Sequence, residues 1–429
     1  MTLSSKKSIL KGAVRIPSSK SYTHRALIAA SLSDGNSKLD NLLLSSDTLA
    51  TVDACIAFGS QIKITGNSAN VSGSSSIKLP QNIINANNSG TTIRIMTALS
   101  SLCPDGYVVL TGDESLRNRP MEPLLDALNQ LDVMCWSTRL NGTPPIIVKG
   151  GGLNGGSVEI PGNISSQFIT AILIASTKSK RDVKLDVTGM LVSRPYIDST
   201  IRILDLFGCN VISNNDQFII PSNQSFTPTN FTVPGDFSSA SFIMAAAAIT
   251  NGTVKIEGLD FNMPQADMRM IDILLELGVG VEINTLEGSV TINGVDSLGS
   301  GDFNLSDSPD LLPAVATLAS KTSGEISIHG VRHARFKETD RISALANEFK
   351  KAGIIVVESD DGLRLSPPSN LKPFKADSHL DHRIFMALSV LGLVSDSKCI
   401  ISGNETISVS YPSFISDIQS LGGSFEVIN

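Results

Sequence analysis

A short polar turn leading directly into an Ala-, Ile- and Leu-rich segment recurs six times along the chain, at intervals of about 72 residues. The turns are rich in Ser, Gly or Asp, which suit helix starts, and the segments are apolar enough to form buried helices. The turns begin at Ser18, Asn88, Ser165, Asp236, Ser308 and Asp381. Repetition at a fixed period predicts an architecture built from one recurring supersecondary unit, so it constrains the fold more than any single motif.

A second helical pattern with a polar start follows each of these segments after about 30 residues. The second patterns begin near Asp47, Met121, Pro195, Gln265, Lys337 and Pro412. Glycines stand where helix C-caps are expected, namely Gly59, Gly208, Gly278, Gly353 and Gly422. Short β-branched runs lie between the helices, such as those before Pro17, Pro161 and Pro234 and the hairpin-like pair around Gly288. The unit therefore reads strand, helix, strand, helix, strand, strand.

The length of 429 residues exceeds one ordinary core and predicts two domains. The sixth unit, from about Asp381, runs out of chain early, so we expect it to borrow a strand from residues 8–16. Three repeats would then form a domain of residues 17–234, and three would form a discontinuous domain of residues 1–16 and 235–429. We expect an α/β (α+β) fold with hinges at the two crossings and the ligand site in the cleft between the domains.

Composition excludes several functional classes. The net charge of −7, from 34 Lys plus Arg against 41 Asp plus Glu, gives no general attraction for nucleic acid or an acidic membrane. Five scattered cysteines without a CxxC pair argue against a disulfide framework or a zinc site and favour the cytoplasm. The first residues lack the apolar region of a signal peptide, and apolar runs stop near ten residues, so membrane spans are not expected. Motifs for nucleotide phosphates and for a serine nucleophile elbow are missing.

Basic side chains gather at the helix starts although only 17% of the residues are charged. A cation there opposes the helix dipole, so the pattern predicts that bound anions answer it; for any single turn, capping alone remains an alternative. Those at first helices are Lys20, Arg25, Arg94, His382 and Arg383. Those at or before second helices are Arg117, Arg119, Arg194, Lys337 and Arg341. We expect Arg332 and Arg335 to be surface or structural residues.

Two carboxylates among these cations are candidates for proton transfer. Asp310 begins an apolar helix and suits a general base, and Glu338 lies beside Lys337 and could shuttle protons through it. His382 could be an acid or only a hydrogen-bond donor. Helix capping is sufficient to explain Asp47, Asp236 and Asp340, and no metal-ligand spacing is seen for His24, His329, His333 and His379. The expected chemistry is acid–base catalysis on a small, highly anionic substrate.

Nine segments resemble, in order and from end to end, the EPSP synthases, which are the 3-phosphoshikimate 1-carboxyvinyltransferases of the shikimate pathway. They are PSSKSYTHRA, NNSGTTIR, LRNRPMEPL, SSQF, SRPYID, GDFSSASF, SPDLLP, RFKETDR and DHR, and the first is more similar to archaeal members. The resemblance implies transfer of the enolpyruvyl group of phosphoenolpyruvate to the 5-hydroxyl of shikimate 3-phosphate, with release of phosphate. It also implies the enolpyruvyl transferase fold, an inside-out α/β barrel of six βαβαββ-type repeats, in a cytoplasmic monomer that needs no cofactor and no metal.

The resemblance also assigns roles to residues, position by position. Contacts with shikimate 3-phosphate fall on Lys20, Ser21, Arg25, Ser165, Ser166, Gln167, Ser193, Tyr196, Asp310, His333 and Lys337. Contacts with phosphoenolpyruvate fall on Lys20, Gly90, Arg119, Gln167, Arg341 and Arg383. Catalytic roles fall on Asp310 as the base at the 5-hydroxyl and on Glu338 with Lys20 at the methylene proton. We add His382 as a catalytic candidate from its position between Asp381 and Arg383. The fourth turn, GDFSSASF, supplies no residue with an assignable role.

The sequence departs from the family pattern at several of these places. Val409 stands where many relatives carry a Lys before the Pro of the last helix, so one cation for phosphoenolpyruvate is lost and a weaker site is expected. Other departures are His333 and His24 for Asn, Ser18 for Gly and Ser89 for Ala. Two rivals remain: a UDP-N-acetylglucosamine enolpyruvyl transferase, opposed by Lys20-Ser21 and by a cysteine-free GDESLRNRP loop, and a non-catalytic anion-binding repeat protein.

Overall fold

The computed structural model describes residues 2–428 and divides into two compact units. The continuous unit is Ser18–Val233, and the discontinuous unit joins Met1–Pro17 to Pro234–Asn429. The expected boundary of 17–234 lies one residue from each of these division points. Each unit contains three repeats, which are described separately below.

In the continuous unit each repeat has two helices, the first of which is α1, α3 or α5, and two consecutive strands follow the second helix. The first contains α1 (Lys20–Ser31), β3 (Gly35–Asp40), α2 (Ser46–Ala57), β4 (Gln61–Thr65) and β5 (Ser68–Gly73). The second contains β6 (Ile84–Asn85), α3 (Gly90–Ser100), β7 (Tyr107–Thr111), α4 (Glu122–Gln130), β8 (Cys135–Ser137) and β9 (Ile146–Lys149). The third contains β10 (Gly156–Pro161), α5 (Ser166–Ser176), β11 (Val183–Thr188), α6 (Arg194–Leu206), β12 (Ile212–Asn214) and β13 (Gln217–Ile220), and β14 (Phe231–Thr232) ends the unit.

The discontinuous unit opens with β1 (Thr2–Lys6) and β2 (Lys11–Arg15) and repeats the same order. The fourth repeat contains α7 (Phe237–Ile249), β15 (Thr253–Glu257), α8 (Arg269–Glu276), β16 (Gly280–Asn284) and β17 (Ser289–Asn293). The fifth contains β18 (Gly301–Asn304), α9 (Leu312–Leu318), β19 (Ile326–His329), α10 (Arg341–Lys351), β20 (Ile355–Ser359) and β21 (Gly362–Ser366). The sixth contains β22 (Lys375–Asp377), α11 (His382–Gly392), β23 (Cys399–Ser402), α12 (Phe414–Ser420) and β24 (Ser424–Ile428).

Six separate four-stranded sheets, one for each repeat, are found within residues 2–428. In the third repeat the order is β10-β11-β13-β12, with β10 parallel to β11 and the other pairs antiparallel. The second and fifth repeats also build their sheets from their own strands alone, in the orders β6-β7-β9-β8 and β18-β19-β21-β20. The mixed α/β fold expected from the repeat is confirmed, although the sheets of the described chain are open and do not join into one closed barrel.

The two chain crossings exchange strands between repeats. The β2 strand, which precedes α1 in sequence, pairs in parallel with β15 of the fourth repeat. The β14 strand, which precedes α7, pairs in parallel with β3 of the first repeat. Each crossing strand therefore completes the sheet of the unit that the chain is leaving.

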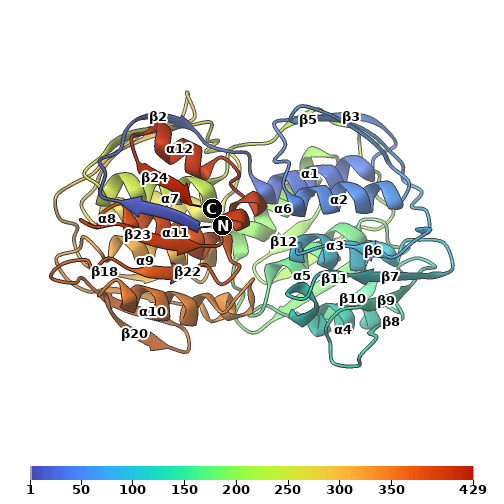
Figure 1. Cartoon of the computed structure of the whole chain (residues 1–429). Helices are drawn as coiled ribbons and strands as arrows, with labels where there is room; N and C mark the ends of the chain where they lie inside the picture. Colours follow the sequence, from blue (N-terminus) through green and yellow to red (C-terminus); the bar gives the residue numbers. More distant parts are fainter. Residues whose placement is uncertain (1, 429) are drawn as a thin grey trace. The chain divides into compact units, whose positions relative to one another are not determined.

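The sixth sheet, ordered β22-β23-β1-β24, is completed by the N-terminal strand β1. In Figure 1 this strand is blue and lies among red strands from the end of the chain, with Leu3 opposite Ile401 on one side and Val427 on the other. The expected lending strand of residues 8–16 is therefore wrong, because residues 11–15 pair with β15 instead. Both chain ends lie in the discontinuous unit, as expected.

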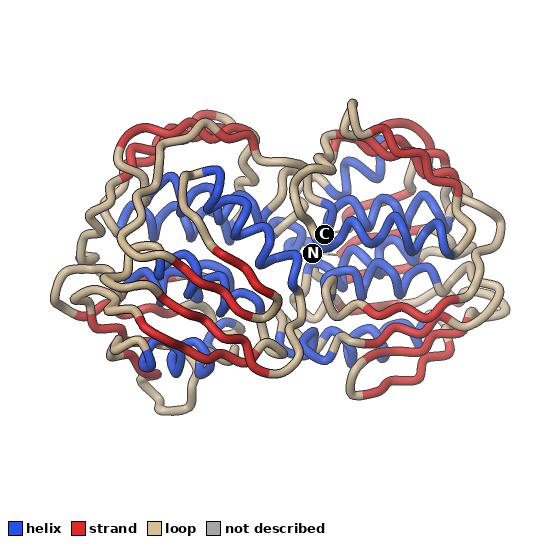
Figure 2. The backbone as a smooth tube through the Cα atoms, turned by 180° about the vertical axis from the view of Figure 1, so that it is seen from behind, coloured by secondary structure: helices blue, strands red, loops and turns tan. Residues whose placement is uncertain are grey.

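The first helix of each repeat forms the core of its unit. Every residue of α7, α9 and α11 is buried, and α1, α3 and α5 are nearly as enclosed. The second helices are amphipathic: α4, for example, buries Leu124, Leu125, Ala127 and Leu128 and leaves its other face exposed. Figure 2 shows the result within each unit, with strands at the periphery and helices between them.

Most helix starts and stops follow the local signals in the sequence. Side chains of Ser19, Ser89, Ser165, Asp236 and Asp381 cap their first helices. The glycines expected at C-caps have positive φ, for example 108° at Gly59 and 89° at Gly353. The helix expected near Lys337 begins at Arg341, because residues 332–336 form a 3-10 turn and the Asp340 side chain caps α10. The expectation that Asp47 caps α2 is wrong: Ser45 is the cap.

Candidate active site

Arg25 gathers predicted binding residues of the continuous unit around one buried guanidinium. It is one and a half turns into α1, and its Nη1 donates to the hydroxyl of Ser21 over 2.6 Å. Its Nε donates to Oγ1 of Thr200 over 2.8 Å, and Nη2 donates to the carbonyl of Tyr196 over 3.0 Å. Burial lowers the pKa of Arg25 to about 10, which leaves the group charged at neutral pH. The α1 and α6 helices thus place Arg25, Ser21 and Tyr196 together.

Lys20 occupies the first position of α1, where its ammonium lies 3.2 Å from Oδ2 of Asp47. Both side chains are largely enclosed, with 18% and 7% of their surfaces exposed. Asp47 is therefore the ion-pair partner of Lys20 and not the helix cap that the sequence predicted. The contact fixes the Lys20 ammonium beside the starts of α1 and α2.

Two guanidinium groups converge over Gly90 at the start of α3. A Cβ atom on Gly90 would lie 3.1 Å from Nη1 of Arg119 and 3.2 Å from Nη1 of Arg94. Arg94 donates to Oε1 of Gln167 over 2.5 Å, and Gln167 donates in turn to Oγ1 of Thr91 over 3.1 Å. Arg119 donates to Asn88 over 2.8 Å. The structure thus brings together Gly90, Arg119 and Gln167, which are predicted to bind phosphoenolpyruvate. Arg94, to which the family resemblance assigned no role, lies among them.

The starts of α5 and α6 supply small hydroxyl groups. Ser165 caps α5, its Oγ accepting from the backbone N–H of Gln167 over 3.3 Å, and Ser166 is the buried first residue of the helix. Ser193 directly precedes α6 and has the left-handed backbone conformation, with φ 59°. Non-glycine residues adopt this conformation rarely, and they do so preferentially at functional sites. Free backbone N–H groups at such helix starts attract anions.

In the discontinuous unit, Arg341 binds three carboxylates from three different turns. Its guanidinium donates to Asp381 over 2.7 Å, to Asp310 over 2.8 Å and to Glu338 over 2.6 Å. Only 1% of the Arg341 side chain is exposed. Burial by itself lowers the pKa of Arg341, but the charges of Asp381, Glu338 and Asp310 outweigh it and raise that pKa above its ordinary value.

Asp310 is surrounded by cations. Besides Arg341, its carboxylate accepts from Nη2 of Arg383 over 3.0 Å and lies 3.6 Å from the ammonium of Lys337. From the sequence we expect Asp310 at the start of an apolar helix. In the structure Asp310 lies in a 3-10 turn, Pro309–Leu311, just ahead of α9. These cations, and not a long helix dipole alone, set the electrostatic environment of this carboxylate.

Two buried histidines accompany this cluster. Burial, and then the charge of Lys337, lower the pKa of His333 to about 4, so its imidazole is neutral at pH 7. His382 is the buried first residue of α11 and directly follows the cap Asp381. The helix start therefore places His382 next to Arg383, one of the cations on Asp310.

The sequence did not reveal Asp267, a buried carboxyl in the 3-10 turn before α8. Burial, and then the negative charge of Asp310, raise the pKa of Asp267 to about 7. The hydroxyl of Ser238, from the fourth turn, donates to its Oδ2. Asp267 stands between the polar residues Gln265 and Arg269, so its local sequence gives no signal that it is buried.

Other basic residues have local structural partners. Arg117 donates to the carbonyl of Gly112 over 3.0 Å, and Arg194 pairs with Asp198 over 2.9 Å. Arg335 pairs with Asp340 and Glu358, in agreement with the expected structural role. Within residues 2–428, no three His, Cys, Asp or Glu side chains are grouped so that they could hold a metal ion. No helix in the same range has the length and apolar character needed to span a bilayer.

Residues 5–418 match the family model described as EPSP synthase (3-phosphoshikimate 1-carboxyvinyltransferase). The chain belongs to the EPSP synthase family. The resemblance carried by the nine motifs is thereby confirmed over almost the whole chain.

Archaeal relatives and solved structures of EPSP synthase agree with this assignment. The 3-phosphoshikimate 1-carboxyvinyltransferase of Methanococcus maripaludis strain C5 is 41% identical over 423 residues, which is 98% of each chain. That of Korarchaeum cryptofilum is 43% identical over 417 residues, which is 97% of each chain. A structure of EPSP synthase from Acinetobacter baumannii covers 100% of both chains with a TM-score of 0.85 and 27% identity. The enolpyruvyl transferase NikO from Streptomyces tendae, 16% identical with a TM-score of 0.79, shares the fold.

Proposed function

We propose that this chain transfers the carboxyvinyl group of phosphoenolpyruvate to the 5-hydroxyl of shikimate 3-phosphate and releases phosphate. The observation that carries the proposal is the carboxylate of Asp310 held by Arg341, Arg383 and Lys337 in a chain of the EPSP synthase family. A general base surrounded by anion-binding groups is what the addition of an alcohol to a phosphorylated enol requires.

The discontinuous unit supplies the proton-transfer groups of the proposed reaction. Asp310 removes the proton of the 5-hydroxyl while the new C–O bond forms at the central carbon of phosphoenolpyruvate, and Glu338, with Lys20 of the continuous unit, delivers a proton to the methylene carbon. In the second step a proton leaves the resulting methyl group as the C–O bond to phosphate breaks. The proton added to the methylene carbon is thus returned to Glu338 and Lys20, and the proton that Asp310 took from the 5-hydroxyl leaves with the phosphate, so the products are the enol ether and phosphate. We place His382 beside these groups as a further donor.

Guanidinium groups bind phosphoenolpyruvate in this proposal. Arg341 and Arg383 donate to carboxylates over 2.6 to 3.0 Å, and the same donors suit the oxyanions of a substrate. Arg119 lies with Arg94 over Gly90, and the absence of a Cβ leaves the space at the helix start open to an anion. Such clamps hold the reacting atoms in line and stabilise charge that develops in the transition state.

Shikimate 3-phosphate is bound chiefly by the continuous unit in this proposal. The phosphate receives hydrogen bonds from the hydroxyls of Ser165, Ser166 and Ser193 and from the helix start at Gln167. Arg25, already bonded to Ser21 and to the Tyr196 carbonyl, supplies positive charge. His333 and Lys337 are the proposed contacts from the discontinuous unit, with the neutral imidazole of His333 acting as a donor.

We also propose that the enzyme acts as a cytoplasmic monomer on these two small molecules. All of the residues assigned to the reaction belong to one chain, and its five cysteines are free and buried, as a reducing compartment favours. Sedimentation velocity of the purified protein at several concentrations tests the monomer.

Phosphate release tests the proposed reaction directly. We expect the protein to release phosphate when both shikimate 3-phosphate and phosphoenolpyruvate are present, and neither substrate alone should suffice. UDP-N-acetylglucosamine replaces shikimate 3-phosphate in the parallel assay, and turnover only in that assay would identify the rival transferase. An Asp310→Asn variant should lose at least about 100-fold in kcat, because it removes the base. Unchanged turnover in this variant would contradict the assigned role.

A further inference from the structure

His379 and Leu380 form an unusual connection between β22 and α11. Both residues are left-handed, with φ of 50° and 59°, and a leucine in this conformation is a true outlier. Such backbone persists only where surrounding contacts dictate it. The connection directly precedes the start of α11, which carries Asp381, His382 and Arg383.

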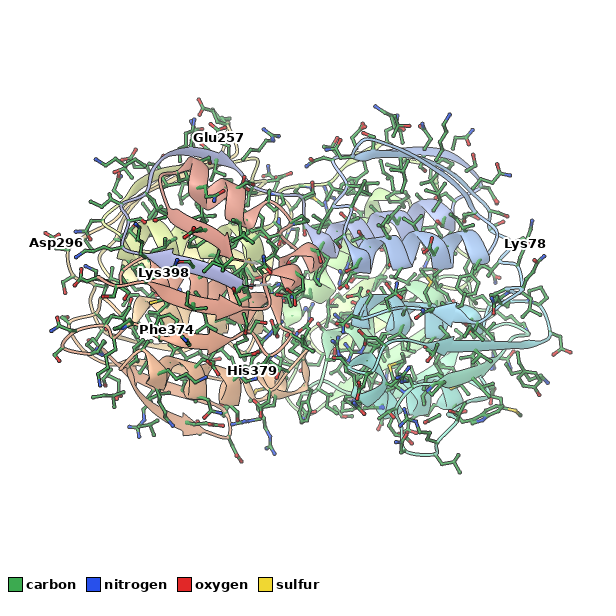
Figure 3. The ribbon with its side chains drawn as sticks, in the orientation of Figure 1. Lys78, Glu257, Asp296, Phe374, His379 and Lys398 are labelled. Carbon is green, nitrogen blue, oxygen red and sulfur yellow. The ribbon has the colours of Figure 1, made fainter. Side chains whose placement is uncertain are left out.

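The carboxylate of Glu348, on α10, holds this connection from one side. Its Oε2 accepts from the backbone N–H of Asp377 over 3.1 Å, and its Oε1 lies 3.0 Å from Nε2 of His379. Only 3% of the Glu348 side chain is exposed, whereas 38% of His379 is exposed. Figure 3 labels His379 in the discontinuous unit. Lys351 supplies a further charge to Glu348, at 2.7 Å.

The same helix holds the connection at a second point. Arg341 and Glu348 are seven residues, or about two turns, apart on α10, so both project from one face. Arg341 binds Asp381 over 2.7 Å, just beyond the two left-handed residues. Asp381 then accepts from the backbone N–H of Arg383 over 2.8 Å and so caps α11. The segment from Asp377 to Asp381 is thus fastened to α10 at both ends.

We propose that Glu348 and His379 are positioning residues for the transfer reaction: they fix the 377–381 segment so that α11 begins where Arg383 reaches Asp310. The inference rests on the proposed function for its kinetic consequence and on the contacts above for its structural one. Neither residue touches the substrates in this account. If the contacts of Glu348 are lost, the strained segment relaxes and the start of α11 shifts. The 3.0 Å hydrogen bond between Arg383 and Asp310 is then lengthened or broken.

Two variants test separately the two partners of the contact between Glu348 and His379. Glu348→Gln keeps the shape of the side chain and removes its charge, and His379→Ala removes the imidazole at a partly exposed position. Glu426→Gln is the matched control, because Glu426 forms an exposed ion pair with Lys398 in the same unit. His379→Gln retains a donor for Glu348 and should restore much of the lost activity.

Kinetics and hydrogen exchange form the test. We expect Glu348→Gln and His379→Ala to raise KM for phosphoenolpyruvate about tenfold or more, with a much smaller rise for shikimate 3-phosphate, because displacements near 1 Å cost up to about 100-fold. Amides in the first turn of α11 should lose at least about tenfold in protection, whereas those of α7 should not. Glu426→Gln should behave as wild type in both measurements.

The outcomes distinguish the inference from the function on which it rests. A wild-type protein without transferase activity would refute the proposed function, and the exchange data would still decide whether Glu348 and His379 hold α11. Unchanged protection of α11 in both variants would overturn the inference. So would an equal loss of protection in α7 and α11, or equal rises of both KM values, because either result is that of a merely structural contact.

Discussion

The Nε of Arg341 donates to Oδ2 of Asp381 over 2.7 Å although the two residues lie 40 positions apart in the chain. Asp381 caps α11 and Arg341 opens α10, so this contact joins the starts of two helices from different repeats. Arg341 extends the same guanidinium to Asp310 and Glu338, the proposed base and acid. One buried side chain therefore orders the carboxylates of this cluster.

Replacing Arg341 with Met should destabilise the protein severely. Three carboxylates would remain beside a site without its central cation, and breaking a buried ion pair by removing one partner costs about 3 kcal/mol or more. Urea unfolding at pH 7 without substrates measures the loss. An Arg335→Met variant, which removes a partly exposed structural arginine, is the control and should cost less. Equal losses of unfolding free energy in the two variants would show that the Arg341 cluster stabilises the fold no more than an exposed ion pair does.

Asp267 should make stability fall as pH rises from about 4 to about 7. The pKa of its folded form is raised from 3.8 to about 7, chiefly by burial, so in this window the native protein holds a proton that the unfolded chain has lost. The stabilisation from this group is fully present below the pKa of the unfolded chain. It is lost, by up to about 4 kcal/mol, as the pH rises through the pKa of the folded form. Asp267→Asn, which cannot ionise, should therefore stabilise the protein at pH 8 more than at pH 5. Urea unfolding of both proteins at the two pH values measures the difference, and a pH-independent effect would contradict the assignment.

Gly90→Ala should weaken phosphoenolpyruvate binding selectively. The added methyl would lie within 3.2 Å of Nη1 atoms on Arg94 and Arg119, so both guanidinium groups must shift. We expect KM for phosphoenolpyruvate to rise about tenfold, as for the loss of one charge-assisted hydrogen bond. Steady-state kinetics with each substrate varied in turn checks this, together with a melting curve. If KM rises more for shikimate 3-phosphate than for phosphoenolpyruvate, the assignment of Gly90 to the phosphoenolpyruvate site is wrong.

Val409→Lys should strengthen phosphoenolpyruvate binding by adding the cation that the resemblance to the family leads us to expect at this position. Val409 is half-buried at the end of a 3-10 turn before α12, so a lysine can be accommodated there. We expect KM for phosphoenolpyruvate to fall about fivefold, the effect of roughly 1 kcal/mol. Ser408→Lys adds the same charge at the neighbouring exposed position and is the control. An unchanged KM in Val409→Lys would refute the idea that the missing lysine weakens this site.

Local contacts explain why much of the fold was readable from the sequence. Ser165 and Asp236 cap helices by accepting from N–H groups two or three residues away, and Gly353 ends a helix through its own left-handed backbone. The residues that decide these features are adjacent in the chain. The candidate site was partly readable for the same reason, since Lys20, Arg25 and Arg383 lie at helix starts.

The residues that contact these side chains in space could not be predicted from the sequence. The sequence around Asp47 predicts a helix cap, but Asp47 pairs with Lys20 from 27 positions away, and nothing local distinguishes the two roles. Asp267 has no periodic or motif signal, because its properties come from burial and from the nearby charge of Asp310. Arg94 was recognised as a helix-start cation, but only packing placed it over Gly90.

The sixfold repeat, the order of elements within it and most helix ends can be predicted from the amino-acid sequence, because they depend on composition and on contacts between near neighbours. Strand pairing is different: β1 and not residues 8–16 completes the sixth sheet, and β2 and β14 each pair with a strand of another repeat. Backbone hydrogen bonds can join any two strand edges, so pairing is chosen by what the whole unit brings together. The same non-local packing gathers Asp310, Glu338 and Asp381 around Arg341.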